Sequence, residues 1–170
     1  SGDFLQTPIA TARETVTVNV VAVMELLHAL LPDMIARAQQ SKRRAGVIVV
    51  SSMGAFVPAP AGLACYAATK VFELRLAEAL AKEHRPDPLD VLALCPTWTN
   101  TDFFARAGLP SPQRAMAAEA VAKEGLEALG RRTVHLCSMR PHPRIYPQII
   151  RRLAAFNPAL AVWHWHWHWG

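Results

Sequence analysis

The segment from residue 46 to residue 70 constrains the fold of this chain more than any other. A run of four β-branched residues, Val47 to Val50, ends in the paired serines Ser51 and Ser52. Such a run is typical of a strand that is buried on both faces, as in a parallel sheet. Because open α/β sheets bind ligands beyond the carboxyl ends of their strands, we expect functional residues just after Val50.

The next helical segment supplies a phenol and an ammonium. Tyr66 and Lys70 are four residues apart, so they share one face of a helix. A free tyrosine has a pKa of about 10 and exchanges protons poorly at neutral pH. A neighbouring cation favours the phenolate, and a serine hydroxyl from the strand end would hold the same substrate oxygen. The pattern predicts a site that adds or removes a proton on a carbonyl or alcohol oxygen.

Four motifs in this order resemble the short-chain dehydrogenase/reductase family. Tyr66 to Lys70 match its Y-x-x-x-K motif, and the paired serines match its serine strand. Residues 17–20 and 30–34 resemble its asparagine helix, and Cys95-Pro96 with Thr101 resembles its P-G-x-x-x-T segment. The resemblance covers residues 10–138. It is strongest to the branch of 17-beta-hydroxysteroid dehydrogenases, 3-ketoacyl-CoA reductases and their bacterial relatives.

The resemblance implies an α/β fold with a Rossmann-like, doubly wound parallel sheet. Neither G-x-G-x-x-G nor G-x-x-x-G-x-G occurs in the chain, which opens Ser1-Gly2-Asp3. We therefore expect the N-terminal half of the domain, with its glycine-rich loop and first strands, to be missing. Residues 1–150 are expected to form this partial domain, and residues 151–170 a basic helix followed by a disordered His/Trp tail.

The resemblance also implies roles for individual residues. Tyr66 donates the proton in reduction, Lys70 lowers the pKa of Tyr66 and holds the nicotinamide ribose, Ser52 steadies the carbonyl, and Asn19 supports a proton relay. The expected cofactor-binding residues are Lys70, Tyr66, Pro96, Thr97, Thr99 and Thr101, with Thr97 standing where the family has glycine.

The serine assignment keeps a rival. Ser52 lies 14 residues before Tyr66, one more than is usual in the family, so Ser51 remains an alternative. The extra residue is expected in the loop at residues 58–62. If so, Ser52 points toward Tyr66, because neighbours on a strand point to opposite faces.

Apolar periodicity and breaker residues predict the remaining elements. Pro32 should kink the first helix or end its regular part. The expected elements are helices at 7–40, 64–84, 112–129 and 147–156, strands at 89–94 and 132–139, and a loop at 97–113. In that loop, Phe103 and Phe104 either line an apolar substrate pocket or simply pack beneath the surface.

Composition narrows the class of protein. The net charge of +5 comes from scattered arginine pairs without a basic stripe, which argues against nucleic acid. The apolar stretches are interrupted before the roughly 20 residues of a membrane span, and no signal segment opens the chain. Three separate cysteines suggest reduced thiols in a cytoplasm.

No metal site is assigned. His164, His166 and His168 alternate as metal ligands can, but a disordered tail is the favoured reading.

Two functions follow. The first is an oxidoreductase that uses NADP or NAD, with NADP favoured by the resemblance, on a lipophilic keto-acyl or steroid-like substrate, in a homo-oligomer. The second is a catalytically silent fragment that acts as a dimerisation module through the helices at 7–40 and 64–84. Without a glycine-rich loop, we expect the 170-residue chain alone to self-associate and to bind neither NADH nor NADPH measurably.

Overall fold

A computed structural model describes residues 2–57, 61–110 and 112–137 of the chain. The sheet at its centre has the strand order β1-β2-β5, with β1 at Ala45–Val50, β2 at Leu89–Cys95 and β5 at Val134–Leu136. All three strands are parallel: Ala45 to Val50 lie beside Leu89 to Leu94, and Ala93 to Cys95 lie beside Val134 to Leu136. Within the described residues, β2 is the central strand and β1 has one neighbour.

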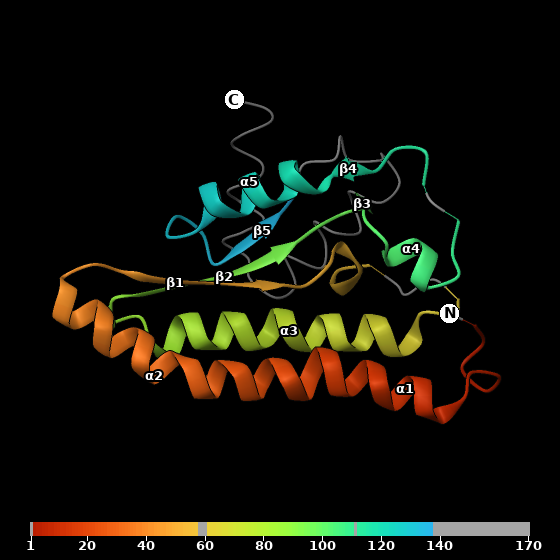
Figure 1. Ribbon diagram of the computed structural model, residues 1–170, viewed down its shortest axis with the longest axis horizontal. Helices are drawn as coiled ribbons and strands as arrows, with labels where there is room; N and C mark the ends of the chain where they lie inside the picture. Colours follow the sequence, from red (N-terminus) through yellow and green to blue (C-terminus); the bar gives the residue numbers. More distant parts are fainter. Residues whose placement is uncertain (1, 58–60, 111, 138–170) are drawn as a thin grey trace.

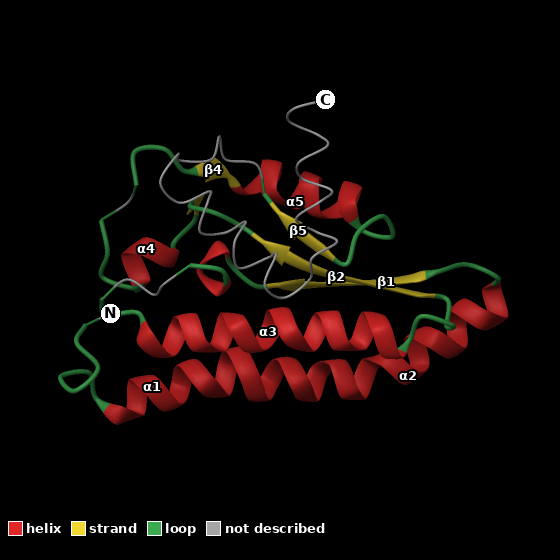
Figure 2. Cartoon of the chain, turned by 180° about the vertical axis from the view of Figure 1, so that it is seen from behind, coloured by secondary structure: helices red, strands yellow, loops and turns green. Residues whose placement is uncertain are grey.

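Helices cover both faces of this sheet. The helix α3 (Ala64–Glu83) connects β1 to β2 and packs against β2, and α5 (Ala118–Ala128) precedes β5. Figures 1 and 2 show α3 on one side of the strands and α5 on the other. This arrangement confirms the predicted α/β fold with a parallel sheet that is wound on both faces.

One continuous helical run lies along α3. It consists of α1 (Ile9–Val16), a π-helical segment at Thr17–Ala22, and α2 (Val23–Ser41). Pro32 was expected to kink the helix or to end its regular part, and the second alternative is wrong, because α2 continues through Pro32 to Ser41. Figure 1 shows the run bending toward its C-terminal end. The residue after it, Lys42, takes a left-handed conformation with φ of 55°, which ends the helix.

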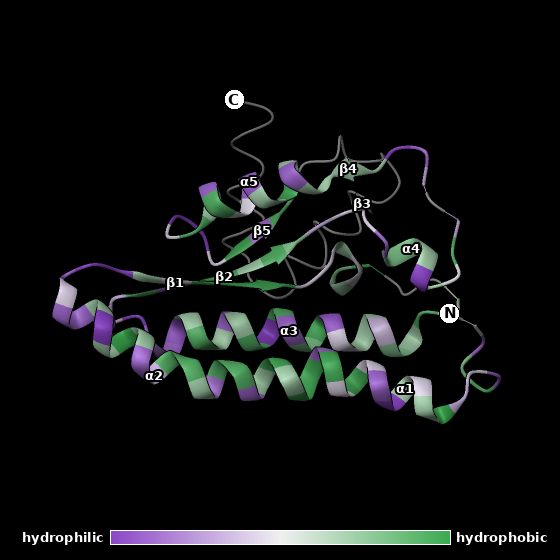
Figure 3. Ribbon diagram, in the orientation of Figure 1, coloured by the Kyte–Doolittle hydropathy of each residue, from purple (hydrophilic) through white to green (hydrophobic). Residues whose placement is uncertain are grey.

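The outer surface of this run is apolar. Large hydrophobic side chains remain exposed on it: Ile9, Val16, Val18, Met24, Leu26 and Leu30. Figure 3 shows the hydrophobic colour along the middle of the run. The helix Ile9–Ser41 is long and apolar enough to span a membrane by length and composition, contrary to the expectation from the sequence. Core helices of soluble proteins and signal sequences meet the same criterion, so this finding does not assign the helix to a membrane.

The core lies between β1, β2 and α3. Its buried side chains include Leu74 from α3, which is 1% exposed, and Val91 from β2, which is 5% exposed. Full burial of one such side chain contributes roughly 1.5 to 3 kcal/mol. On the opposite face, α5 approaches the sheet closely at Gly125, where an added Cβ would lie 2.8 Å from Leu94 Cδ2.

The second half of the chain departs from the predicted boundaries. The loop expected at 97–113 contains β3 (Thr99–Asn100) and the short helix α4 (Phe103–Arg106). The helix expected from residue 112 begins only at Ala118, because β4 (Met116–Ala117) stays extended to pair with β3. The strand expected at 132–139 is observed at Val134–Leu136. The helix predicted at 147–156 and the His/Trp tail lie outside the described residues.

Candidate active site

The two serines at the end of β1 have different environments. The Ser52 hydroxyl accepts a hydrogen bond from the Gly54 backbone N–H at 3.0 Å and interacts with the Tyr66 hydroxyl. The Ser51 hydroxyl donates to the backbone carbonyl of Lys70 at 2.6 Å, and Ser51 is only 3% exposed. Ser52 therefore meets the functional end of Tyr66, whereas Ser51 ties the strand end to the backbone of α3. The loop residues 58–60, where an extra residue was expected, lie outside the described residues.

Tyr66 and Lys70 lie together on the first turns of α3. The Lys70 ammonium nitrogen lies 5.6 Å from the centroid of the Tyr66 ring. It also donates to the backbone carbonyl of Val50 at 3.1 Å, so the lysine reaches back to the end of β1. The predicted convergence of serine, phenol and ammonium at the carboxyl end of β1 is thus present in the geometry.

The pKa of Tyr66 is shifted in the direction opposite to that expected. Burial raises it, the interaction with the Ser52 side chain lowers it, and the negative charge of Glu73 raises it again, with a net result above the usual value. The sequence had suggested that Lys70 would lower this pKa. The difference arises mainly from burial of the phenol, and a carboxylate that the sequence pattern did not reveal adds to it.

That carboxylate is Glu73, which is only 2% exposed. Its two oxygens accept hydrogen bonds from Lys70 Nζ at 3.0 and 2.8 Å. Burial raises the pKa of Glu73, and the bond and charge of Lys70 oppose that shift. A glutamate three residues after a lysine normally indicates a solvated helix face. One feature of the sequence pointed to the burial of Glu73: it directly precedes Leu74, an apolar position of the predicted helix.

Asn19 connects the long helical run to α3. It lies within the π-helical segment, a rare conformation that is frequent at functional sites. Its side-chain amide donates to the Thr69 hydroxyl at 3.0 Å, and that hydroxyl donates to the Tyr66 backbone carbonyl at 2.8 Å. The structure therefore places Asn19 against the residue that precedes Lys70.

The predicted cofactor-binding residues follow β2, next to the end of β1. The Pro96 carbonyl accepts a hydrogen bond from the Met53 N–H at 2.8 Å, which joins the two strand ends. The threonine hydroxyls make local contacts: Thr97 with Met116 Sδ at 3.6 Å, Thr99 with the Thr97 carbonyl at 3.1 Å, and Thr101 with the Phe103 N–H at 3.3 Å. All four residues lie at the carboxyl edge of the sheet, and the Thr101 residue is exposed.

An aromatic row extends from Tyr66 into the loop after β2. The rings of Tyr66 and Phe103 have centroids 5.2 Å apart, and those of Phe103 and Phe104 are 5.3 Å apart in an edge-to-face arrangement. Phe104 also lines an open hollow of about 180 Å³, together with Asn100, Pro112, Gln113 and Ala115. The apolar side of the site therefore begins at the Tyr66 ring itself.

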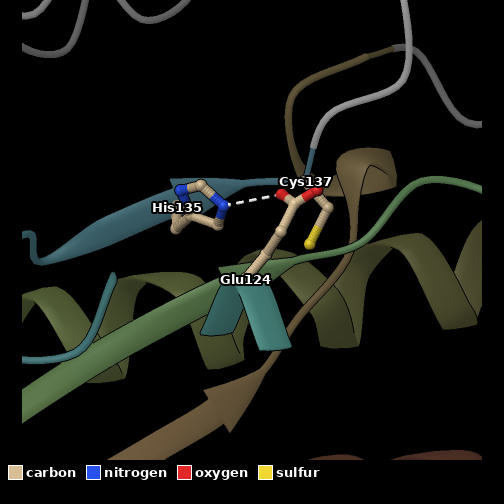
Figure 4. A group of neighbouring side chains, drawn as sticks. All are labelled: Glu124, His135 and Cys137. Carbon is tan, nitrogen blue, oxygen red and sulfur yellow. Dashed lines mark hydrogen bonds and ion pairs between the residues drawn. The ribbon is translucent and has the colours of Figure 1, made fainter. Parts of the chain in front are cut away.

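A separate polar cluster lies on the α5 side of the sheet and was not predicted. Figure 4 shows Glu124, His135 and Cys137, whose ligand atoms lie within 4.8 Å of one another. Carboxylate, imidazole and thiol together can hold Zn²⁺. Here His135 Nε2 contacts Glu124 at 2.9 Å and its Nδ1 contacts Arg132 at 3.5 Å, so both ring nitrogens already have partners. Burial raises the pKa of the Cys137 thiol to about 12.

The family model and the curated proteins that the chain resembles are dehydrogenases and reductases. The family model described as short chain dehydrogenase matches residues 1–110. A very-long-chain 3-oxoacyl-CoA reductase of Laccaria bicolor is 34% identical over 88 residues, which is 52% of this chain and 24% of that protein. A 1-deoxy-11-beta-hydroxypentalenate dehydrogenase of Streptomyces exfoliatus is 33% identical over 138 residues, covering 78% of this chain and 48% of that protein.

Comparison with solved structures supports the fold. A short-chain dehydrogenase from Sphingobium yanoikuyae in complex with NADPH superposes with a TM-score of 0.74 at 24% identity, covering 92% of this chain and 60% of that one. The chain spans about a quarter of the length of the Laccaria relative and about half of the length of the Streptomyces relative.

Proposed function

Because residues 1–110 match the model of the short-chain dehydrogenase family, the chain belongs to that family, and we propose that it forms part of an NAD(P)-dependent oxidoreductase. The reaction interconverts a carbonyl and a secondary alcohol on a lipophilic substrate. The single observation that carries the proposal is the convergence of Ser52, Tyr66 and Lys70 at the carboxyl end of β1.

Each side chain has a separate task in this reaction. The Tyr66 hydroxyl gives its proton to the carbonyl oxygen in reduction and takes it back in oxidation. The Ser52 hydroxyl, which interacts with that phenol, holds the same oxygen in place. Lys70 supplies positive charge beside the ring, and Asn19 steadies this turn of α3 through Thr69. The nicotinamide cofactor supplies the hydride when it is bound.

The residues at this edge fit the nicotinamide end of such a cofactor. Lys70 carries the kind of donor suited to ribose hydroxyls, although Glu73 and Val50 hold its three donors in this structure. The exposed Thr101 lies on the loop that follows β2. Pro96, Thr97 and Thr99 complete the loop, and Tyr66 lies across from it. NADP is favoured over NAD, because the similar Sphingobium enzyme is a complex with NADPH.

The substrate class follows from the aromatic row and the relatives. Phe103 packs beside Tyr66 and Phe104 packs against Phe103, so an apolar chain or ring would lie against these rings next to the reacting oxygen. One relative is named for a very-long-chain 3-oxoacyl-CoA and the other for a hydroxylated pentalenate. We propose a keto-acyl or steroid-like substrate and, from the three free thiols, a cytoplasmic location.

The test uses the polypeptide that carries this sequence, produced both as the 170 residues and together with any contiguous upstream coding sequence. NADPH oxidation is followed with 3-oxoacyl-CoA esters of increasing length and with a steroid ketone. We expect turnover that rises with chain length in the polypeptide that also carries a glycine-rich loop, and no measurable NADH or NADPH binding by the 170 residues alone. Cofactor binding without turnover of any of these carbonyl compounds would reject the proposal.

A dimerisation module is the second candidate function. It is favoured by the apolar side chains exposed along α1 and α2, including Leu26 and Leu30. Buried apolar area is the main source of stability in obligate interfaces. Self-association together with a lack of turnover in every form of the polypeptide would favour this candidate over the oxidoreductase.

A further inference from the structure

The ion pair between Lys70 and Glu73 leaves the lysine with its hydrogen-bonding capacity filled. An ammonium group has three N–H donors. Three oxygens lie within 3.1 Å of Lys70 Nζ: the two carboxylate oxygens of Glu73 and the backbone carbonyl of Val50. The pair is also protected from water, since the side chains are 13% and 3% exposed.

A second pair on the same helix shows how unusual this one is. Arg75 and Glu78 have the same three-residue spacing, but their side chains are 41% and 29% exposed. Water screens such a pair, and exposed pairs contribute little to stability. The Lys70–Glu73 pair is buried beside a proposed proton donor, so its charges act over short distances in a medium of low dielectric constant.

The other groups around Tyr66 are mostly uncharged. From the end of β1 come the Ser52 hydroxyl and the Val50 carbonyl, from the π-helical segment the Asn19 amide through Thr69, and from α4 the Phe103 ring. The Cys95 thiol of β2 lies by the two serines, and burial raises its pKa to about 12. Among the described groups, Lys70 and Glu73 are thus the charged side chains that bear on the phenol.

We propose that Glu73 is a positioning residue that holds the Lys70 ammonium in a closed ion pair and limits how strongly this positive charge favours the Tyr66 phenolate. The proposal deepens the function proposed above and rests on it for the roles of Tyr66 and Lys70. With Glu73 ionised, the phenol is held in its protonated, donating form. Without that negative charge, the ammonium acts on the phenol uncompensated and its donors become available to a ribose hydroxyl.

Tyrosine content makes the test direct. The chain has two tyrosines, Tyr66 and Tyr146, so a Tyr146→Phe chain has Tyr66 as its single phenol. Tyrosinate absorbance in the near ultraviolet is recorded against pH for this chain and for the same chain with Glu73→Gln. Circular dichroism at each pH restricts the comparison to the pH range in which both chains are folded. The matched control is Glu78→Gln, which removes a carboxylate at the same spacing on the same helix.

We expect Glu73→Gln to move the onset of tyrosinate absorbance to lower pH, because removing a nearby negative charge stabilises the phenolate. Glu78→Gln should leave the onset unchanged. If Glu73→Gln does not fold, Glu73→Met, which is similar in length and uncharged, should show the same shift. An onset that stays in place or moves to higher pH in a folded Glu73 variant would overturn the proposal.

The measurement needs neither cofactor nor turnover, so its outcome is separate from that of the oxidoreductase assay. A shifted onset together with a lack of turnover in every form of the polypeptide would retain the role of Glu73 and remove the proposed reaction. An active enzyme whose onset does not shift would keep the reaction and remove Glu73 from it.

Discussion

The helical layer formed by α1, α2 and α3 has buried polar side chains on one side and exposed apolar side chains on the other. Where α3 meets the end of β1, polar side chains are buried and each has a named partner, as for Ser51, Lys70 and Glu73. On the outer surface of α1 and α2, apolar side chains such as Leu26 and Leu30 are 60% and 53% exposed.

The two regions should therefore respond differently to single substitutions. A buried polar group whose partner is removed loses one specific interaction and keeps its desolvation cost, so single substitutions there should have large effects. An exposed apolar surface acts through its area, so single substitutions there should have small and roughly additive effects. The predictions below test this contrast, beginning with the largest expected effect.

The first prediction concerns Tyr66, the proposed proton donor. In the polypeptide that shows activity, Tyr66→Phe should lower turnover by about 10²- to 10⁴-fold, the usual contribution of general acid-base catalysis. Cofactor affinity should remain largely intact, because only the hydroxyl is lost. Steady-state kinetics and a fluorescence titration of the reduced cofactor measure the two quantities. A variant that keeps most of its turnover would remove Tyr66 from the mechanism.

The second prediction concerns the buried pair. Lys70→Ala should weaken both turnover and cofactor affinity, and it should also lower the free energy of unfolding by about 3 to 5 kcal/mol, because Glu73 is left as an unpaired buried charge. Adding Glu73→Gln should restore much of the stability but not the turnover. Denaturant unfolding of the single and double variants measures this. Equal stability of the two variants would contradict the assignment of the pair as buried and coupled.

The third prediction separates the neighbouring serines. Ser52→Ala should cost far more turnover than Ser51→Ala, because only the Ser52 hydroxyl interacts with that of Tyr66. Ser51→Ala should mainly cost stability, by about 1 kcal/mol, through the lost bond to the Lys70 carbonyl. The reverse ranking in kinetic assays would transfer the catalytic role to Ser51.

The fourth prediction addresses the outer surface. We expect the 170-residue chain to self-associate, and the combined change Leu26→Gln and Leu30→Gln to weaken that association modestly while leaving helix content unchanged. The control is Leu126→Gln on α5, a position that is 68% exposed on the other side of the sheet. Sedimentation velocity at several concentrations compares the three chains. If the control weakens association as much as the double variant, the association surface is not on α1 and α2.

Local sequence was sufficient for the elements that carry the site. The β-branched run before Ser51 predicted β1, the spacing of Tyr66 and Lys70 placed both on one face of α3, and Gly130 marked the end of α5. These features depend on side-chain periodicity and backbone preference, which neighbouring residues determine. The sequence did not predict the short strands β3 and β4, because Met116 is extended only through its pairing with Thr99, 17 positions earlier.

The partners within the site were decided by the tertiary structure alone. Asn19 meets Thr69 across 50 positions of sequence, and Ser52 meets Tyr66 across 14. The sequence established that Glu73 is charged and three residues after Lys70. Its burial depends on how α3 is rotated against the sheet, and local periodicity does not fix the rotation that separates a solvated carboxylate from one buried beside a phenol.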